Sequence, residues 1–164
     1  MSAIVLLDTS VYLNVLDVEG WNQNRDAVLA EFRTRVEARD YFLLPMATIW
    51  ETGNHIAHLF DGGRRRHYAQ KLVDDIRRAV NGETPYRATH FPDREEFLIW
   101  LNDFPDYAQR RKSPSKPGEG VSLADLSIIK EWEQTRVRHS MSQVLFWSLN
   151  SDLSGYNADG DTRG

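Results

Sequence analysis

The sequence lacks cysteine altogether, which excludes disulfide bonds and thiolate metal sites. It also lacks any stretch close to the roughly 20 consecutive apolar residues that a helix needs to cross a bilayer. The apolar run near the N-terminus is too short for a secretory signal peptide, and no basic residue precedes it. We therefore expect a cytoplasmic protein that does not bind a membrane.

An overall basic charge is missing as well. The chain carries a formal net charge of −4 at pH 7, which argues against a protein whose whole surface binds nucleic acid. Basic residues nevertheless gather in two segments, one with Arg64, Arg65, Arg66 and Lys71 and the other with Arg110, Arg111 and Lys112. Either segment is a candidate for nucleic-acid contact, the alternative being an ordinary solvated face.

The familiar nucleotide-binding motifs are also absent, since the chain contains neither a GxxxxGK phosphate loop nor a GxGxxG fingerprint. What it does contain is an alternation of short apolar runs and helical patterns. Uninterrupted apolar runs predict buried strands at 3–7, 41–44 and 144–147, with a weaker candidate at 86–91. Apolar residues at helical spacing predict helices over 26–38, 45–59, 64–80, 92–103 and 122–138.

This alternation predicts an α/β fold, namely a three-layer α/β/α sandwich around a central, mostly parallel sheet of four to five strands. We expect one domain over residues 1–156, followed by a polar, disordered tail over 157–164. The breaker-rich segment 113–120, SPSKPGEG, predicts a flexible loop. In such sheets ligands bind at the carboxyl ends of the strands, so residues that directly follow a strand are the first candidates for function.

Three acidic residues lie in apolar surroundings instead of charged segments. Asp8 directly follows the first predicted strand, whereas Glu51 and Asp125 lie early in helices among apolar neighbours. Taken singly, each has a structural alternative, such as helix capping or a favourable position in the helix dipole. Taken together, carboxylates that converge on one point repel each other unless a cation lies among them. Magnesium or manganese is the expected partner, because both prefer oxygen ligands and activate water for attack on a phosphodiester.

Four segments in sequence order resemble the motifs of the PIN-domain nucleases, a family that includes the VapC-type toxins of bacterial toxin–antitoxin pairs. These segments are LDTSVYL at 7–13, LPMATIWE at 44–51, GVSLADLSII at 120–129 and VLFWSLNSDL at 144–153. The resemblance spans about residues 3 to 157 and departs from the family pattern at two positions. Asn150 stands where many members have aspartate, and Ser148 replaces the usual threonine. The segment Asp103–Gly120 is also longer than in compact members, as an added specificity loop would be.

The resemblance implies a metal-dependent endoribonuclease. Its catalytic residues would be Asp8, Glu51, Asp125 and Asp152. Asp8, Glu51 and Asp125 would hold one or two Mg²⁺ or Mn²⁺ ions, with Asn150 or Asp152 completing the shell and Ser10 and Ser148 in support. Water activated by the metal would attack an RNA phosphodiester and leave a 5′-phosphate and a 3′-hydroxyl, while the two basic segments contact the RNA backbone. For a toxin, the family also implies a homodimer and an antitoxin protein that blocks the cleft.

Other classes of protein compete with this interpretation. Asn150 motivates a catalytically weak PIN-like module that binds RNA or a protein without cutting. A phosphatase of the haloacid-dehalogenase type needs a second aspartate two residues after the first, where this chain has Ser10. A receiver domain needs an acidic pair at the first strand, whereas Leu6 and Leu7 precede Asp8 here.

Two further pairs of side chains have both a functional and a structural interpretation. His55 and His58 have a spacing that can bind metal, but no third histidine is linked to them, and a polar helix face is the simpler explanation. Aromatic residues such as Trp21 and Tyr12 are candidates for stacking on bases. Packing in the core is the alternative for most of the five tryptophans.

Overall fold

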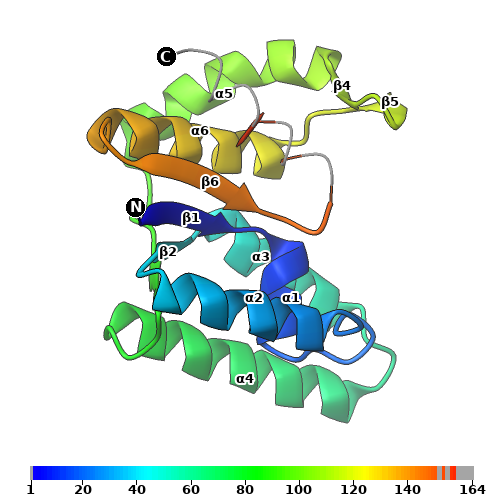
Figure 1. Ribbon diagram of the computed structural model, residues 1–164. Coiled ribbons are helices and arrows are strands. Elements are labelled where there is room, and N and C mark those ends of the chain that lie inside the picture. The colour runs from blue at the N-terminus through cyan, green and yellow to red at the C-terminus, as the bar shows by residue number, and fades with distance from the viewer. Residues whose placement is uncertain (1, 151–152, 154–155, 158–164) are drawn as a thin grey trace.

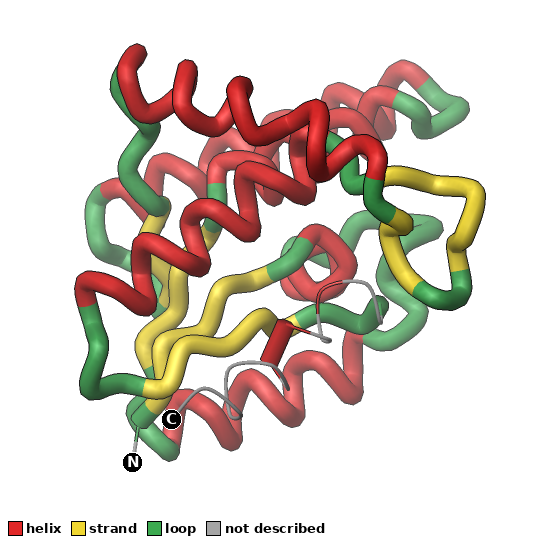
Figure 2. The backbone as a smooth tube through the Cα atoms, turned by 90° about the horizontal axis from the view of Figure 1, so that it is seen from above, coloured by secondary structure: helices red, strands yellow, loops and turns green. Residues whose placement is uncertain are grey.

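The computed structural model describes residues 2–150, 153, 156 and 157 of the chain. Its strands are β1 (Ala3–Leu7), β2 (Tyr41–Leu44), β3 (Tyr86–Ala88), β4 (Arg111–Ser113), β5 (Lys116–Gly120) and β6 (Gln143–Trp147). Its helices are α1 (Thr9–Val15), α2 (Arg25–Glu37), α3 (Met46–Ala57), α4 (Gly62–Val80), α5 (Arg94–Gln109) and α6 (Leu123–Arg138). Four strands form a parallel sheet in the order β3-β2-β1-β6, with helices on both faces (Figures 1 and 2). The predicted α/β fold with a central parallel sheet is confirmed, and the helical layers are compatible with a three-layer sandwich.

The side chains of β1 explain why helices cover both faces of the sheet. Val5 and Leu7 belong to a core shared with α1, α2 and α4, whereas Ile4 and Leu6 belong to a second core shared mainly with α6. Successive side chains of a strand point to opposite faces, so an unbroken apolar run buries both. Thr48 of α3 donates a hydrogen bond to the carbonyl oxygen of Leu7 at 2.8 Å and fastens α3 to the carboxyl end of this strand.

Two elements of the structure end at residues other than those that the sequence predicts. The helix predicted over 92–103 continues to Gln109, although Pro105 lies inside it and removes one backbone N–H donor. The strand predicted at 86–91 ends at Ala88, because its partner β2 ends at Leu44 and offers no ladder beyond that point. No helix in the described part of the chain is both long and apolar enough to cross a membrane.

The predicted flexible loop at 113–120 is wrong, because this segment forms part of the antiparallel hairpin β4–β5. Contacts with α5 hold the hairpin. The N–H of Val121 donates to the carbonyl oxygen of Tyr107 at 3.3 Å. A side chain at Gly120 would collide with the carbonyl of Ala108, so the close approach to α5 requires glycine there. The long segment noted in the PIN resemblance therefore consists of the last turns of α5 and this hairpin.

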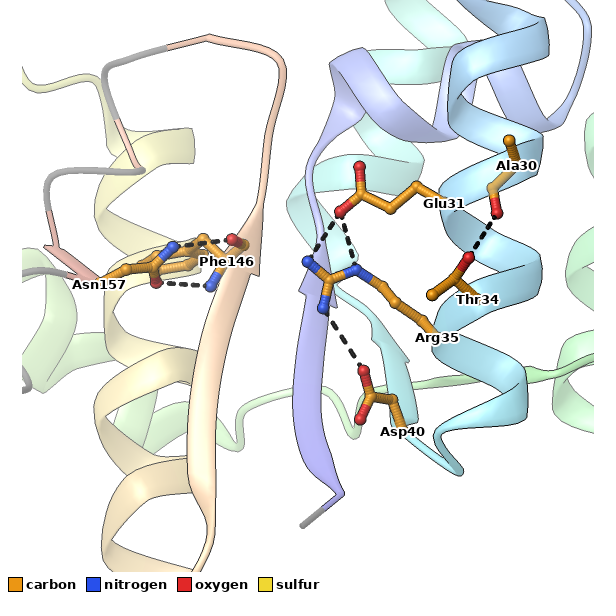
Figure 3. A network of polar contacts seen from close by, with 7 residues as sticks. All are labelled: Ala30, Glu31, Thr34, Arg35, Asp40, Phe146 and Asn157. Atoms are coloured by element: carbon orange, nitrogen blue, oxygen red, sulfur yellow. Dashed lines mark hydrogen bonds and ion pairs between the residues drawn. The ribbon is translucent and has the colours of Figure 1, made fainter.

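Asn157, the first residue of the predicted tail, is bonded to the edge strand β6. Its side-chain amide donates to the carbonyl oxygen of Phe146 and accepts from the N–H of Phe146, both at 2.9 Å (Figure 3). These two bonds imitate one step of a strand ladder and satisfy backbone groups at the free edge of the sheet. Residues 158–164 of the predicted tail lie outside the described residues.

Asp40 ties the start of β1 to α2. One of its carboxylate oxygens accepts a hydrogen bond from the N–H of Ala3 at 2.8 Å. The other lies 3.4 Å from the guanidinium of Arg35, which also donates to Glu31 one turn earlier on α2 (Figure 3). This network anchors the amino end of the central strand, at the opposite end from the predicted site.

Candidate functional site

The carboxyl ends of β1 and β6 open into a cavity of about 400 Å³. Asp8, Glu51 and Asp125 reach it from the end of β1, from the middle of α3 and from the first turn of α6. The cavity is also lined by Ser10, Ser148 and Asn150. Asp152, the remaining residue predicted to be catalytic or to bind the metal, lies outside the described residues. The fold therefore brings together six of the predicted catalytic, metal-binding and supporting residues from four separate segments of the chain.

Asp8 is held by two hydroxyl groups. It is the N-cap residue of α1, yet its carboxylate makes no capping hydrogen bond. Instead, Asp8 Oδ2 accepts hydrogen bonds from Ser10 at 3.0 Å and from Ser148 at 2.8 Å. Its backbone N–H donates to the carbonyl oxygen of Trp147 at 3.0 Å and extends the β1–β6 ladder by one step. The structural alternative of helix capping therefore does not account for this carboxylate.

The pKa of the Glu51 carboxyl responds to burial and to the charges of Asp125 and Asp8. Thr9 Oγ1 donates to Glu51 Oε2 at 2.8 Å. Burial raises the pKa of the Glu51 carboxyl, and the negative charges of Asp125 and Asp8 raise it further, against the lowering effects of Thr9 and His55. The charges of Asp125 and Asp8 therefore act on the Glu51 carboxyl, as expected for carboxylates that line one cavity.

Asp125 has a buried carboxylate oxygen that lies beside a lysine ammonium. Ser122 caps α6 by accepting the N–H of Asp125 at 3.1 Å. Asp125 Oδ2 is buried and accepts no hydrogen bond from the described residues. Lys112 Nζ lies 3.3 Å from this oxygen and 3.9 Å from a carboxylate oxygen of Glu119, and Lys116 lines the same cavity. A buried carboxylate oxygen is costly unless a cation or donors compensate it, and hairpin β4–β5 supplies one ammonium group.

The donors in the cavity suit a hard divalent cation. Carboxylate, amide and hydroxyl oxygens are the ligands that Mg²⁺ and Mn²⁺ prefer. The buried Asp125 Oδ2 accepts no hydrogen bond from the described residues, and the ammonium of Lys112 lies 3.3 Å from it, so this oxygen already lies beside a cation. Within the described ranges, no group of three or more acidic or histidine side chains is arranged so that it could hold a metal ion. The chemistry of the donors therefore fits such an ion, and binding would require the side chains of Asp8, Glu51 and Asp125 to close in on it.

The cavity also includes residues that the sequence analysis did not assign to the site. His55 follows Glu51 by one helical turn, and this spacing was a usable signal because it places both on one face of α3. Its Nδ1 lies 2.7 Å from the carbonyl oxygen of Glu51. His58 is exposed and lies outside the cavity, so the two histidines do not form a pair. Trp21 lines the cavity and is 43% exposed, whereas Tyr12 is completely buried in the core.

The first basic segment lies on α4, away from the cavity. Arg64 forms an ion pair with Glu19 at 2.6 Å, and Arg65 donates to two backbone carbonyls just before the helix. Arg66 and Lys71 line a separate surface hollow on α4. None of these four residues lines the acidic cavity as described.

The second basic segment leads into the cavity. Arg110 lies over the ring of Tyr107, with its guanidinium carbon 4.3 Å from the ring centroid. Arg111 is an exposed residue of β4. Lys112 is the member of the predicted RNA-contact set that lines the cavity, where it contacts Asp125. The second basic segment can therefore contact a ligand at the carboxylates through Lys112, whereas the first segment lies away from the cavity.

Comparisons of the chain with models of protein families, with curated proteins and with solved structures found no match. Function is therefore inferred from the cavity and the residues that line it.

Proposed function

We propose that the protein is a divalent-metal-dependent endoribonuclease of the PIN type. The observation that carries this proposal is the convergence of Asp8, Glu51 and Asp125 on one cavity at the carboxyl ends of parallel strands. Burial and the charges of Asp125 and Asp8 raise the pKa of Glu51, and Asp125 Oδ2 is buried beside the ammonium of Lys112. Acidic groups held together at such cost are suited to binding a cation.

The roles of the acidic residues follow from their positions. Bound Mg²⁺ or Mn²⁺ would supply a polarised water molecule and neutralise charge on the scissile phosphodiester. Asp8, Glu51 and Asp125 would hold the ion, with a neutral amide oxygen of Asn150 in the same cavity. The family resemblance adds Asp152 as a further candidate ligand.

The supporting roles fall to neighbouring polar side chains. Ser10 and Ser148 keep the carboxylate of Asp8 oriented through their hydrogen bonds to Oδ2. Lys112 contacts Asp125 and lines the cavity, so its ammonium is placed to attract a non-bridging phosphate oxygen. If the protein is the toxin of a toxin–antitoxin pair, its partners would be a second copy of the chain and an antitoxin protein in the cytoplasm.

The proposal predicts that the purified protein cleaves RNA in Mg²⁺ or Mn²⁺ and not in EDTA. The metal would be needed to bring water and phosphate together among the carboxylates. Gel analysis of a labelled RNA measures cleavage, and sensitivity of the products to a 5′-phosphate-dependent exonuclease identifies their ends. Cleavage that persists in EDTA would contradict the metal mechanism. RNA binding without cleavage in either metal would favour the alternative of a PIN-like binding module.

A further inference from the structure

The loop between α1 and α2 presents an aromatic side chain to the acidic cavity. Trp21 lines the cavity together with Gln23 and Asn24. The N–H of Trp21 donates to the carbonyl oxygen of Val18 at 3.0 Å, and the N–H of Asn24 donates to the side chain of Asn14 at 3.1 Å. The backbone on both sides of Trp21 is therefore bonded to α1 or to the turn that follows it.

Local side-chain bonds fix the rest of this loop. Asp17 and Gly20 have φ values of 61° and 84°, the left-handed region that allows the chain to turn sharply. The side chain of Asn22 donates to Asp17 at 2.8 Å, and that of Gln23 donates to the carbonyl oxygen of Gly20 at 2.7 Å. Binding of a ligand to Trp21 would cost little conformational entropy, because these hydrogen bonds already order the loop.

Trp21 is only partly packed in this position. Its ring meets the ring of His55 edge to face, with centroids 4.4 Å apart and planes at 85°. Even so, 43% of Trp21 is exposed. Because Trp21 lines the cavity, a ligand bound there would cover part of this apolar surface and gain free energy from its burial. Packing against His55 thus orients the indole ring of Trp21, and the exposed part of the ring is accessible to a ligand.

We propose that Trp21 stacks on an unpaired nucleobase beside the phosphodiester held at the carboxylates, and is a specificity-determining residue of the site. This inference rests on the proposed function, since it places a nucleic-acid phosphate at Asp8, Glu51 and Asp125. An aromatic face stacks on a base that has left its helix, whereas a paired base is already stacked on its neighbours. Trp21 thereby selects single-stranded positions for cleavage.

The test measures binding separately from cleavage. Fluorescence anisotropy with Ca²⁺ in place of Mg²⁺, so that a divalent cation is still present for the carboxylates, compares wild-type protein with Trp21→Ala, using a fluorescein-labelled single-stranded RNA without internal base pairs. We expect Trp21→Ala to bind at least about fivefold more weakly, the low end of the effect of losing one base stack. Trp21→Phe keeps an aromatic face and should recover most of the affinity. Trp50→Ala is the matched control, because Trp50 is 63% exposed but does not line the cavity.

A second RNA of the same length, with abasic residues at its central positions, separates stacking from any effect on folding. Wild type and Trp21→Ala should bind this RNA equally, because it offers no base to stack. Equal binding of the intact RNA by these two proteins, no binding by wild type, or an equal loss in Trp50→Ala overturns the inference. Cleavage in Mg²⁺ tests the proposed function alone, so a protein that shows the expected binding pattern but never cuts would reject the nuclease and keep the stacking residue.

Discussion

Replacing Asp8 with asparagine is expected to lower metal-dependent RNA cleavage at least about a hundredfold, because a bound cation contributes several kcal/mol to transition-state stabilisation. Asparagine has the size of aspartate and can still accept hydrogen bonds from Ser10 and Ser148, which now hold Oδ2. It removes only the negative charge from the group that the cation would bind. Initial rates of RNA cleavage in Mg²⁺ measure the effect.

The same change at an acidic residue outside the cavity provides the control. Asp26 is an exposed residue in the first turn of α2, so Asp26→Asn should cleave RNA at the rate of the wild type. Thermal unfolding of Asp8→Asn should match or exceed that of the wild type, since one repelling charge is gone. An Asp8→Asn protein that is folded and fully active would show that Asp8 has no part in the reaction.

Stability should fall with rising pH because of a carboxyl group outside the cavity, Glu131 of α6. Glu131 is 5% exposed and accepts hydrogen bonds from Thr89 Oγ1 at 3.2 and 3.1 Å. Burial nevertheless raises the pKa of Glu131 to about 7. A raised pKa favours the folded state while the group is protonated. This contribution is complete below the ordinary glutamate pKa and is lost as the pH rises through about 7.

Glu131→Gln should remove this dependence, because glutamine has a similar shape and does not ionise. We expect the variant to be more stable than the wild type by up to about 3 kcal/mol at pH 8, and close to it at pH 5. Urea unfolding at a series of pH values measures the difference. Glu133→Gln is the control on the same helix, since the Glu133 side chain is 45% exposed. A difference between wild type and Glu131→Gln that stays constant with pH would show that Glu131 is not the titrating group.

The sheet could be predicted from the sequence because its strands β1, β2 and β6 are short apolar runs, and the central strand β1 is buried on both faces. Ala3–Leu7 and Tyr41–Leu44 are short apolar runs, and the structure places strands at these same positions. The start of α6 could also be predicted, because serine is a favoured N-cap residue and Ser122 accepts a hydrogen bond from the N–H of Asp125. In these elements the local sequence and the tertiary environment favour the same structure.

Hairpin β4–β5 could not be predicted because its stability depends on distant contacts. Its strands, RKS and KPGEG, have no apolar alternation, and residues 113–120 are rich in proline and glycine. What holds the hairpin is its contact with α5, which itself extends past the point where the sequence predicted its end. The placement of Lys112 on Asp125 follows from this tertiary arrangement and has no signal in the sequence.

The acidic part of the candidate site could be proposed from the sequence because a carboxylate among apolar residues is conspicuous. Asp8, Glu51 and Asp125 all have such neighbours, and the structure brings them to one cavity. Trp21 could be noticed as an aromatic residue but not placed, since only the path of the loop after α1 brings it to the cavity. The contribution of Asp152 stays a prediction.

The central claim is that Asp8, Glu51 and Asp125 form a single site for a divalent cation. Isothermal titration of Mn²⁺ into wild-type protein, Asp125→Asn and Asp26→Asn tests it without any assumption about RNA. We expect Mn²⁺ to bind the wild type and Asp26→Asn alike, and to bind Asp125→Asn at least about tenfold more weakly, since the ion loses a charged ligand. Equal Mn²⁺ affinity in all three proteins, or no binding to the wild type, would contradict the claim.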